Sequence, residues 1–203
     1  MSVLPRLNIR RILPIFALSL ALPALAWTSS EASLTLQPES KLWVEGGSTI
    51  KNWTCQAGDV SAVIEASPNA IAQVVAGEKG IRTVKVTVPA EKLECGNGTM
   101  NKHMKKALKI EEFPTIVFKL SGYDVAKGPA SSTGTLNGTL TLGGVQKTIA
   151  IPAEGRSDAG ALRVTGAYTL KMTDYDLTPP SLMFGRIKVR ESVNVKFDLL
   201  LKS

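Results

Sequence analysis

The sequence predicts an all-β fold, an eight-stranded antiparallel barrel with one short inserted amphipathic helix. Apolar and polar residues alternate through most of the chain, glycine-rich turns separate the alternating runs, and one interval has helical periodicity instead. Strands that are each apolar on one side are expected to close into a barrel, because closure removes exposed edges. A sandwich of two sheets would use the same strand pattern, so the alternation alone leaves that alternative open.

Residues 1–26 have the features of a secretory signal peptide. Arg6, Arg10 and Arg11 precede an apolar run at residues 12–26 that ends in small residues. This run is shorter than the roughly 20 residues that a membrane-spanning helix needs. We therefore expect the chain to be exported and the signal peptide to be removed.

The predicted mature domain, residues 27–203, is mildly basic. Loss of three arginines leaves 21 lysine and arginine residues against 17 acidic ones, a net charge near +4. A net charge of this size does not indicate binding to nucleic acid. An exported protein is also not expected to meet a nucleic-acid partner. The polar side of the alternating strands carries lysine, threonine and asparagine rather than the apolar band of a membrane barrel.

The only two cysteines, Cys55 and Cys95, predict a disulfide. An even number of cysteines in an exported chain favours a disulfide, with two free buried thiols as the alternative. Two cysteines and the single histidine, His103, cannot supply the four ligands of a closed zinc site. We expect neither a metal nor a cofactor.

Eight alternating runs predict the strands. In each, apolar residues take every second position, as in a strand with one buried and one wet face. The runs are "SLTLQ" (33–37), "KLWVEGG" (41–47), "DVSAVIEA" (59–66), "RTVKVTV" (82–88), "TIVFKL" (115–120), "GTLNGTLTL" (134–142), "LRVTGAYTL" (162–170) and "RIKVRESVNVKFDLLL" (186–201). The last run predicts one continuous strand, and Gly143-Gly144 predicts a two-residue hairpin turn.

A helix is predicted from about Thr99 to Ile110, capped by Asn97 or Thr99. Its apolar stripe is Met100, Met104, Ala107 and Leu108, with His103 at the edge. The stripe is either ordinary core or a lid over a pocket, and a lone histidine beside it is expected to pack or to hydrogen-bond. The lysines on the other face are either solvated or in peripheral contact with anionic membrane lipids.

Three longer motifs in order resemble the YceI-like family. They are "GNGTMNKHMKKALKIEEFPTIVFKL", "GTLTLGGVQKTIAIPAEG" and "TGAYTLKMTDYDLTPPSLMFGRIKVRESVNVKFDLLL", and the resemblance extends over residues 33–201. It implies a lipocalin-like eight-stranded antiparallel barrel in the periplasm, with an elongated apolar cavity. It also implies binding of polyisoprenoid chains or fatty-acid derivatives, and relatives are linked to stress tolerance. No catalytic residues belong to the family pattern.

With this resemblance, we expect non-catalytic transport or sequestration of a long apolar amphiphile. The candidate ligand-binding residues are Val86, Met104, Leu108, Ile116, Phe118, Leu140, Ile149, Tyr168, Leu170, Phe184, Ile187, Val189 and Phe197. Tyr168 is a candidate for contact with a ligand headgroup. Glu191 is expected to mark a bulge or a strand turn, with a ligand headgroup as the alternative. A ligand-free protein-interaction or stress module, its cavity filled by its own side chains, is the alternative. The oligomeric state is left open, a dimer included.

Overall fold

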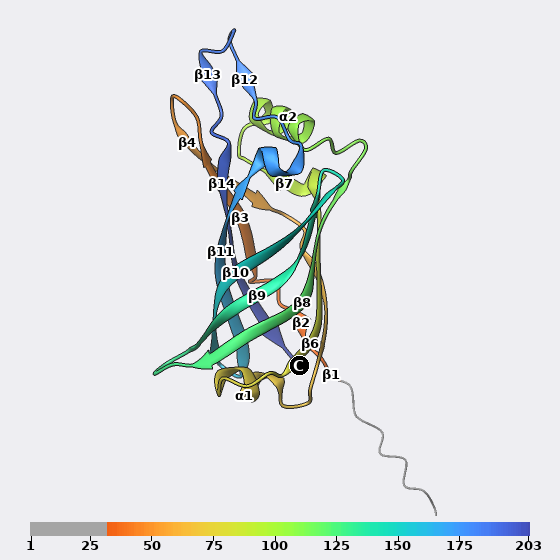
Figure 1. Ribbon diagram of the computed structural model, residues 1–203, viewed down its shortest axis with the longest axis vertical. Helices are drawn as coiled ribbons and strands as arrows, with labels where there is room; N and C mark the ends of the chain where they lie inside the picture. The colour runs from red at the N-terminus through yellow and green to blue at the C-terminus, as the bar shows by residue number, and fades with distance from the viewer. Residues whose placement is uncertain (1–31) are drawn as a thin grey trace, which may run out of the picture.

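The structure is a computed structural model that describes residues 32–203, so the predicted signal peptide, residues 1–26, lies outside the described residues. The described chain is mostly β. A strongly curled antiparallel sheet of 12 strands carries two short α-helices at opposite ends of its long axis (Figure 1). Among the described residues, no helix is long and apolar enough to cross a membrane.

The strands of the curled sheet lie in the order β1-β5-β6-β8-β9-β10-β11-β14-β3-β4-β7, with β2 paired to β14. Their bounds are β1 (Ala32–Ser33), β2 (Thr35–Leu36), β3 (Lys41–Gly47), β4 (Asn52–Ala57), β5 (Ser61–Ala66), β6 (Ile81–Pro89), β7 (Leu93–Glu94), β8 (Thr115–Lys127), β9 (Ser132–Leu142), β10 (Val145–Asp158), β11 (Ala161–Lys171) and β14 (Ser192–Lys202). A separate hairpin contains β12 (Ser181–Leu182) and β13 (Ile187–Lys188). The helices are α1 (Ala70–Val75) and α2 (Gly98–Ala107), with 3-10 turns at Ala90–Lys92 and Met172–Tyr175.

The antiparallel all-β prediction is confirmed, but the sheet differs from the predicted closed barrel of eight strands. It curls into a half-barrel, and its end strands β1 and β7 are hydrogen-bonded to β5 and β4 rather than to each other. Each end strand has two residues. Such short edges offer too few backbone groups to close the ladder, and they also limit pairing with other chains.

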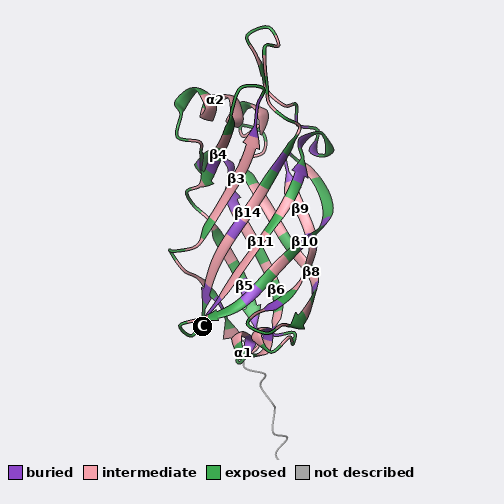
Figure 2. Ribbon diagram, turned by 90° about the vertical axis from the view of Figure 1, so that its left-hand side faces the viewer, coloured by how far each residue is buried: buried purple, intermediate pink, exposed green. Residues whose placement is uncertain are grey.

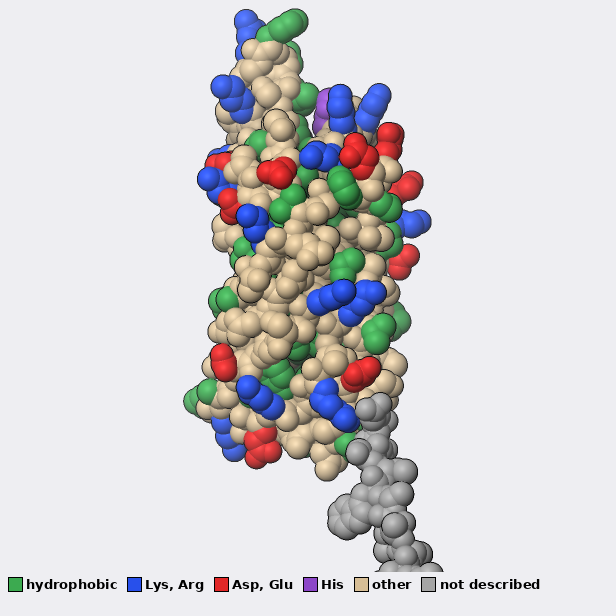
Figure 3. Space-filling view, turned by 45° about the vertical axis from the view of Figure 1, so that its right-hand side comes forward, with side chains coloured by type: hydrophobic (Ala, Val, Ile, Leu, Met, Phe, Trp, Pro, Cys, Tyr) green, Lys and Arg blue, Asp and Glu red, His purple; other side chains and the backbone are tan. Residues whose placement is uncertain are grey.

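Residues that alternate between apolar and polar in the sequence lie on opposite faces of the sheet. Along β10, exposed residues alternate with buried or partly buried ones from Thr148 to Arg156, and Figure 2 shows buried, intermediate and exposed segments along the other long strands. Lysine, arginine, aspartate and glutamate side chains lie on the outer surface (Figure 3). The predicted turn at Gly143-Gly144 is confirmed: both glycines have positive φ, and Leu142 lies opposite Val145 in the hairpin.

Two glycines make room for aromatic rings on the inner face. Gly166 of β11 lies directly opposite Phe197 of β14, and a Cβ at Gly166 would lie 2.4 Å from the Phe197 ring. The Phe118 ring covers Gly138 in the same way, at 2.5 Å from such a Cβ. Glycine has no side chain to shield its backbone, so an aromatic ring that packs over a strand glycine covers backbone that would otherwise be exposed.

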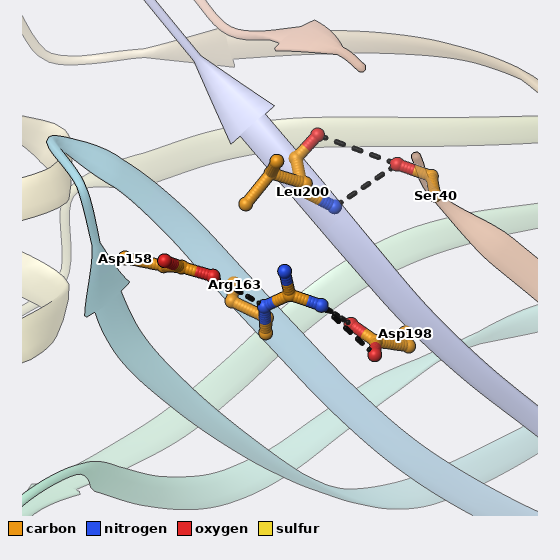
Figure 4. Close-up of polar contacts among 5 residues, drawn as sticks. All are labelled: Ser40, Asp158, Arg163, Asp198 and Leu200. Carbon is orange, nitrogen blue, oxygen red and sulfur yellow. Dashed lines mark hydrogen bonds and ion pairs between the residues drawn. The ribbon is translucent and has the colours of Figure 1, made fainter. Parts of the chain in front are cut away.

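On the outer face of the sheet, ion pairs between charged side chains join neighbouring strands. Arg163 of β11 donates from Nε to Asp158 Oδ2 at 2.7 Å and from Nη1 to Asp198 Oδ1 at 2.9 Å, so one guanidinium joins β10, β11 and β14 (Figure 4). The Ser40 hydroxyl accepts a hydrogen bond from the Leu200 amide at 3.0 Å, which holds the segment before β3 against β14 (Figure 4).

The predicted continuous strand from residue 187 onward is broken in the structure. Ile187 and Lys188 belong to the separate hairpin, and β14 begins only at Ser192. At the break, the Glu191 carboxylate lies 3.4 Å from Lys171 Nζ and accepts a hydrogen bond from the Thr173 hydroxyl. Glu191 therefore marks a strand turn, one of the two roles expected for it.

The predicted inserted helix is α2, which ends earlier than expected. The Asn97 side chain accepts a hydrogen bond from the Met100 amide at 3.0 Å, so Asn97 is the N-cap. Lys109 has a φ of 55°, a left-handed conformation that ends the helix before Ile110. Helix α1 was not predicted, because its six residues are too few to show a helical period.

Candidate binding cavity

The curled sheet encloses a cavity of about 510 Å³. This volume is within the range of roughly 300–1,000 Å³ found for small-molecule sites. The lining is mainly aliphatic and aromatic, because the inward positions of the long strands carry the apolar half of each alternating run. Such a wall favours an apolar molecule over a charged one.

The middle of the cavity is formed by side chains from facing strands. Ile149 and Ile151 of β10 and Phe197 of β14 are buried there. Phe118 and Leu140, partly buried, pack against this group. All five side chains line the cavity, and Val164 and Tyr168 of β11, the strand between β10 and β14, pack against the same group.

Helix α2 lies at one end of the curled sheet (Figure 1), and its residues line the cavity. All four residues of its predicted stripe, Met100, Met104, Ala107 and Leu108, line the cavity. None of them is fully buried, but Ala107 and Leu108 pack against the buried group that contains Leu142 and Leu170. The stripe therefore lies against the cavity and also packs on the core, so it has features of both roles expected for it.

A disulfide joins the base of α2 to the sheet, and this pairing is the one predicted. Cys55 of β4 is bonded to Cys95, which lies just before the Asn97 cap. Cys95 Sγ also lies 3.5 Å from Met104 Sδ. Both cysteines line the cavity, so the disulfide is part of its wall as well as a crosslink.

The polar lining residues differ between the two ends of the cavity. At the α2 end they include Lys51, Asn97 and His103. At the α1 end they include Asp124 and Glu154. Asp124 and Glu154 are exposed and alternate with the buried residues Tyr123 and Gly155, so their carboxylates lie on the outer face of the sheet and only the α2 end has polar side chains beside the cavity.

The structure brings twelve of the thirteen predicted residues together. Those that line the cavity are Val86, Met104, Leu108, Ile116, Phe118, Leu140, Ile149, Tyr168, Leu170, Ile187, Val189 and Phe197. Phe184 differs: its relative exposure is 112%, in the turn between β12 and β13. Its φ of 53° belongs to a tight turn that projects beyond the cavity, and the alternation in the sequence carries no sign of that turn.

Several lining residues were not predicted. Leu42 and Val44 of β3 alternate within "KLWVEGG", and Trp53 of β4 lies two residues before Cys55, so the period-two signal was present in both strands. Leu177 also lines the cavity, but it follows a 3-10 turn, where no periodic pattern could have indicated its direction.

Titratable groups with shifted pKa values lie outside the cavity lining. The hydrogen bond from Lys196, at 2.7 Å, lowers the pKa of Glu45, with a further contribution from Trp43. The Thr173 hydroxyl lowers the pKa of Glu191. Burial raises the pKa of Tyr175, whose hydroxyl has no hydrogen-bond partner within the described part of the chain.

Metal binding was not expected from the sequence. Within residues 32–203, the structure contains no group of three or more histidine, cysteine, aspartate or glutamate side chains placed to hold a metal ion.

Three solved structures share this fold. Burkholderia cenocepacia BcnA is 16% identical with a TM-score of 0.61, covering 79% of this chain and 95% of its own. A polyisoprenoid-binding domain from Saccharophagus degradans, implicated in plant cell wall breakdown, is 15% identical with a TM-score of 0.59, covering 84% of this chain and 98% of its own. The Campylobacter jejuni YceI protein is 19% identical with a TM-score of 0.53, covering 73% of this chain and 85% of its own. No curated protein sequence has a significant match.

At these identities, the solved structures establish the shared fold. The family assignment comes from the sequence. A family model described as YceI-like domain matches residues 34–201. That match spans almost all the described chain, including every strand that lines the cavity and the inserted α2. The chain therefore belongs to the YceI-like domain family.

Proposed function

We propose that this protein binds a long apolar amphiphile in its cavity and carries or sequesters it in the periplasm without chemical change. The observation that carries the proposal is the apolar cavity of about 510 Å³ enclosed by the curled sheet. Burial of a hydrocarbon chain against such a wall contributes about 25 cal/mol per Å² of apolar surface. The ligand class is a polyisoprenoid or a fatty-acid derivative, and the polyisoprenoid-binding domain of Saccharophagus degradans on this fold supports the first of these.

The two ends of the cavity favour one orientation of the ligand. An anionic or hydroxyl headgroup is attracted to the α2 end, where Lys51, Asn97 and His103 supply positive charge and hydrogen-bond donors. The apolar chain then extends from α2 toward α1, along the wall that contains Phe118 and Phe197.

The test is a titration of the delipidated protein with two series of amphiphiles, polyprenols and fatty acids, followed by calorimetry or by quenching of tryptophan fluorescence. Trp53 lines the cavity and serves as the internal reporter. We expect saturable binding of one molecule per chain, with affinity rising with chain length until the cavity is full. No saturable binding by any member of either series would contradict the proposal and favour the ligand-free interaction module.

A further inference from the structure

The end of the molecule that carries α2 also carries a projecting apolar tip. The tip consists of the β12–β13 hairpin, residues 181–190, and the β3–β4 turn, residues 48–51. In Figure 1 the hairpin extends past α2, away from the rest of the sheet. Thr49 joins the two parts, since its amide donates to the Lys188 carbonyl and its hydroxyl donates to the Arg186 carbonyl, both at 3.0 Å.

Large hydrophobic side chains are concentrated on this tip. Ile50 is 65% exposed, Met183 is 63% exposed and Phe184 is fully exposed at 112%. The other large hydrophobic residue with comparable exposure among the described residues is Val63 of β5, outside the tip. Exposed large apolar groups gathered in one place indicate an interaction surface, whereas scattered single ones do not.

The turn of the hairpin has three successive residues with positive φ. Met183, Phe184 and Gly185 have φ values of 50°, 53° and 87°. A left-handed conformation is unfavourable for methionine and phenylalanine, and two such residues in succession are uncommon. Such φ values are those of a tight hairpin turn, which the amide of Gly185 closes by donating to the Leu182 carbonyl at 3.1 Å.

Basic residues surround the apolar tip. Lys51, Arg186, Lys188 and Arg190 are all exposed, and residues 48–51 and 181–190 contain no acidic residue. Figure 3 shows lysine and arginine side chains beside hydrophobic ones on the projecting end. Helix α2 adds the exposed Lys102 and Lys106 at the same end of the molecule.

We propose that this tip docks the protein onto an anionic lipid surface. The apolar side chains would enter the boundary between headgroups and acyl chains, while the surrounding cations meet lipid phosphates. A bilayer fits better than a protein partner, because the apolar groups form a narrow projection and a stable protein interface usually covers about 800 Å² on each side. The docking rests on exposed residues alone and holds whichever molecule the cavity carries.

Docking through the tip would bring the basic α2 end of the cavity to the bilayer. Ile187 and Val189, in or next to the hairpin, also line the cavity, so the docking surface and the cavity wall share a segment of chain. An apolar ligand that moves between bilayer and cavity at this end would cross little water.

The test measures sedimentation of the protein with two kinds of vesicle, one containing phosphatidylglycerol with phosphatidylethanolamine and the other containing phosphatidylcholine alone. We expect binding to the anionic vesicles that weakens as salt concentration rises. The double variant Met183→Ser with Phe184→Ser should lower that binding at least tenfold. The matched control Val63→Ser, which removes an equally exposed apolar side chain outside the tip, should leave it unchanged.

A second variant separates the two contributions. Arg186→Glu with Lys188→Glu should lower binding to anionic vesicles at least tenfold and remove most of its salt dependence. Equal binding by the wild type and both tip variants would overturn the proposal, as would equal binding to the two kinds of vesicle. Sedimentation with neither kind of vesicle would also overturn it.

Discussion

Cys55 of β4 is bonded to Cys95, and Cys95 Sγ lies 3.5 Å from Met104 Sδ of α2. The bond closes a loop across a sequence separation of 40 residues, between one edge of the sheet and the segment that enters α2. Because Met104 faces the cavity, the covalent crosslink and the wall of the candidate site meet at one place.

Removal of this disulfide should destabilise the protein. A loop of this length lowers the entropy of the unfolded chain enough to contribute roughly 4 kcal/mol in the loop-closure model. We expect Cys55→Ser with Cys95→Ser to lower the free energy of unfolding by about that amount, measured by urea denaturation. Wild-type protein in dithiothreitol should approach the variant, and the variant itself should not respond to dithiothreitol. Equal urea midpoints for oxidised wild type and variant would contradict this prediction.

The close approach of Gly166 to Phe197 predicts a sharp effect of adding one methyl group. A Cβ at position 166 would lie 2.4 Å from the Phe197 ring and 2.8 Å from the Pro152 carbonyl oxygen. Gly166→Ala should therefore destabilise the fold by about 1–3 kcal/mol through overpacking. Phe197→Leu in the same chain should restore part of that loss, which a double-mutant cycle in urea would measure. Strict additivity of the two substitutions would show that the ring and the glycine are not coupled.

Tyr175 should control part of the stability at alkaline pH. Burial raises its pKa above the ordinary value of 10.0, so above pH 10 the unfolded chain loses this proton before the folded chain does. The free energy of unfolding should therefore fall as the pH rises above 10, while the contribution is complete below that pH. Tyr175→Phe should flatten this fall, measured by urea denaturation at a series of pH values, and parallel profiles would contradict it.

The same substitution makes a second prediction at neutral pH. The Tyr175 hydroxyl is buried with no hydrogen-bond partner among the described residues. Removing an unpaired buried hydroxyl should leave stability unchanged or raise it by about 1 kcal/mol. A loss of more than that amount in urea denaturation would show that the hydroxyl is in fact hydrogen-bonded.

The direction of the wall side chains was predictable because a period of two fixes which face of the sheet a residue takes. Phe118, Leu140 and Phe197 illustrate this, since each lies on the apolar side of its run and lines the cavity. The same period does not specify the pairing of a strand. The alternation from Ile187 to Val193 is interrupted only at Glu191, and this single polar residue was the one sign of the break between Val189 and the start of β14 at Ser192.

The edges of the sheet were not predictable for a related reason. The terminal strands β1 and β7 have two residues each, which is too short for a periodic pattern. Whether the sheet closes depends on these edges. The position of Phe184 depended on turn geometry, and an aromatic residue in a turn resembles one in a strand when only the sequence is read.

The central claim is that the cavity holds an apolar ligand, and one pair of variants tests it most directly. Ala62 and Val63 are neighbours on β5: Ala62 lines the cavity, whereas Val63 is 63% exposed on the outer face. Native mass spectrometry of exported wild type, Ala62→Trp and Val63→Trp, before and after organic extraction, compares an indole inside the cavity with one outside. We predict a discrete extractable adduct on wild type and Val63→Trp, much reduced on Ala62→Trp. Equal adducts on all three proteins, or none on any of them, would contradict the account.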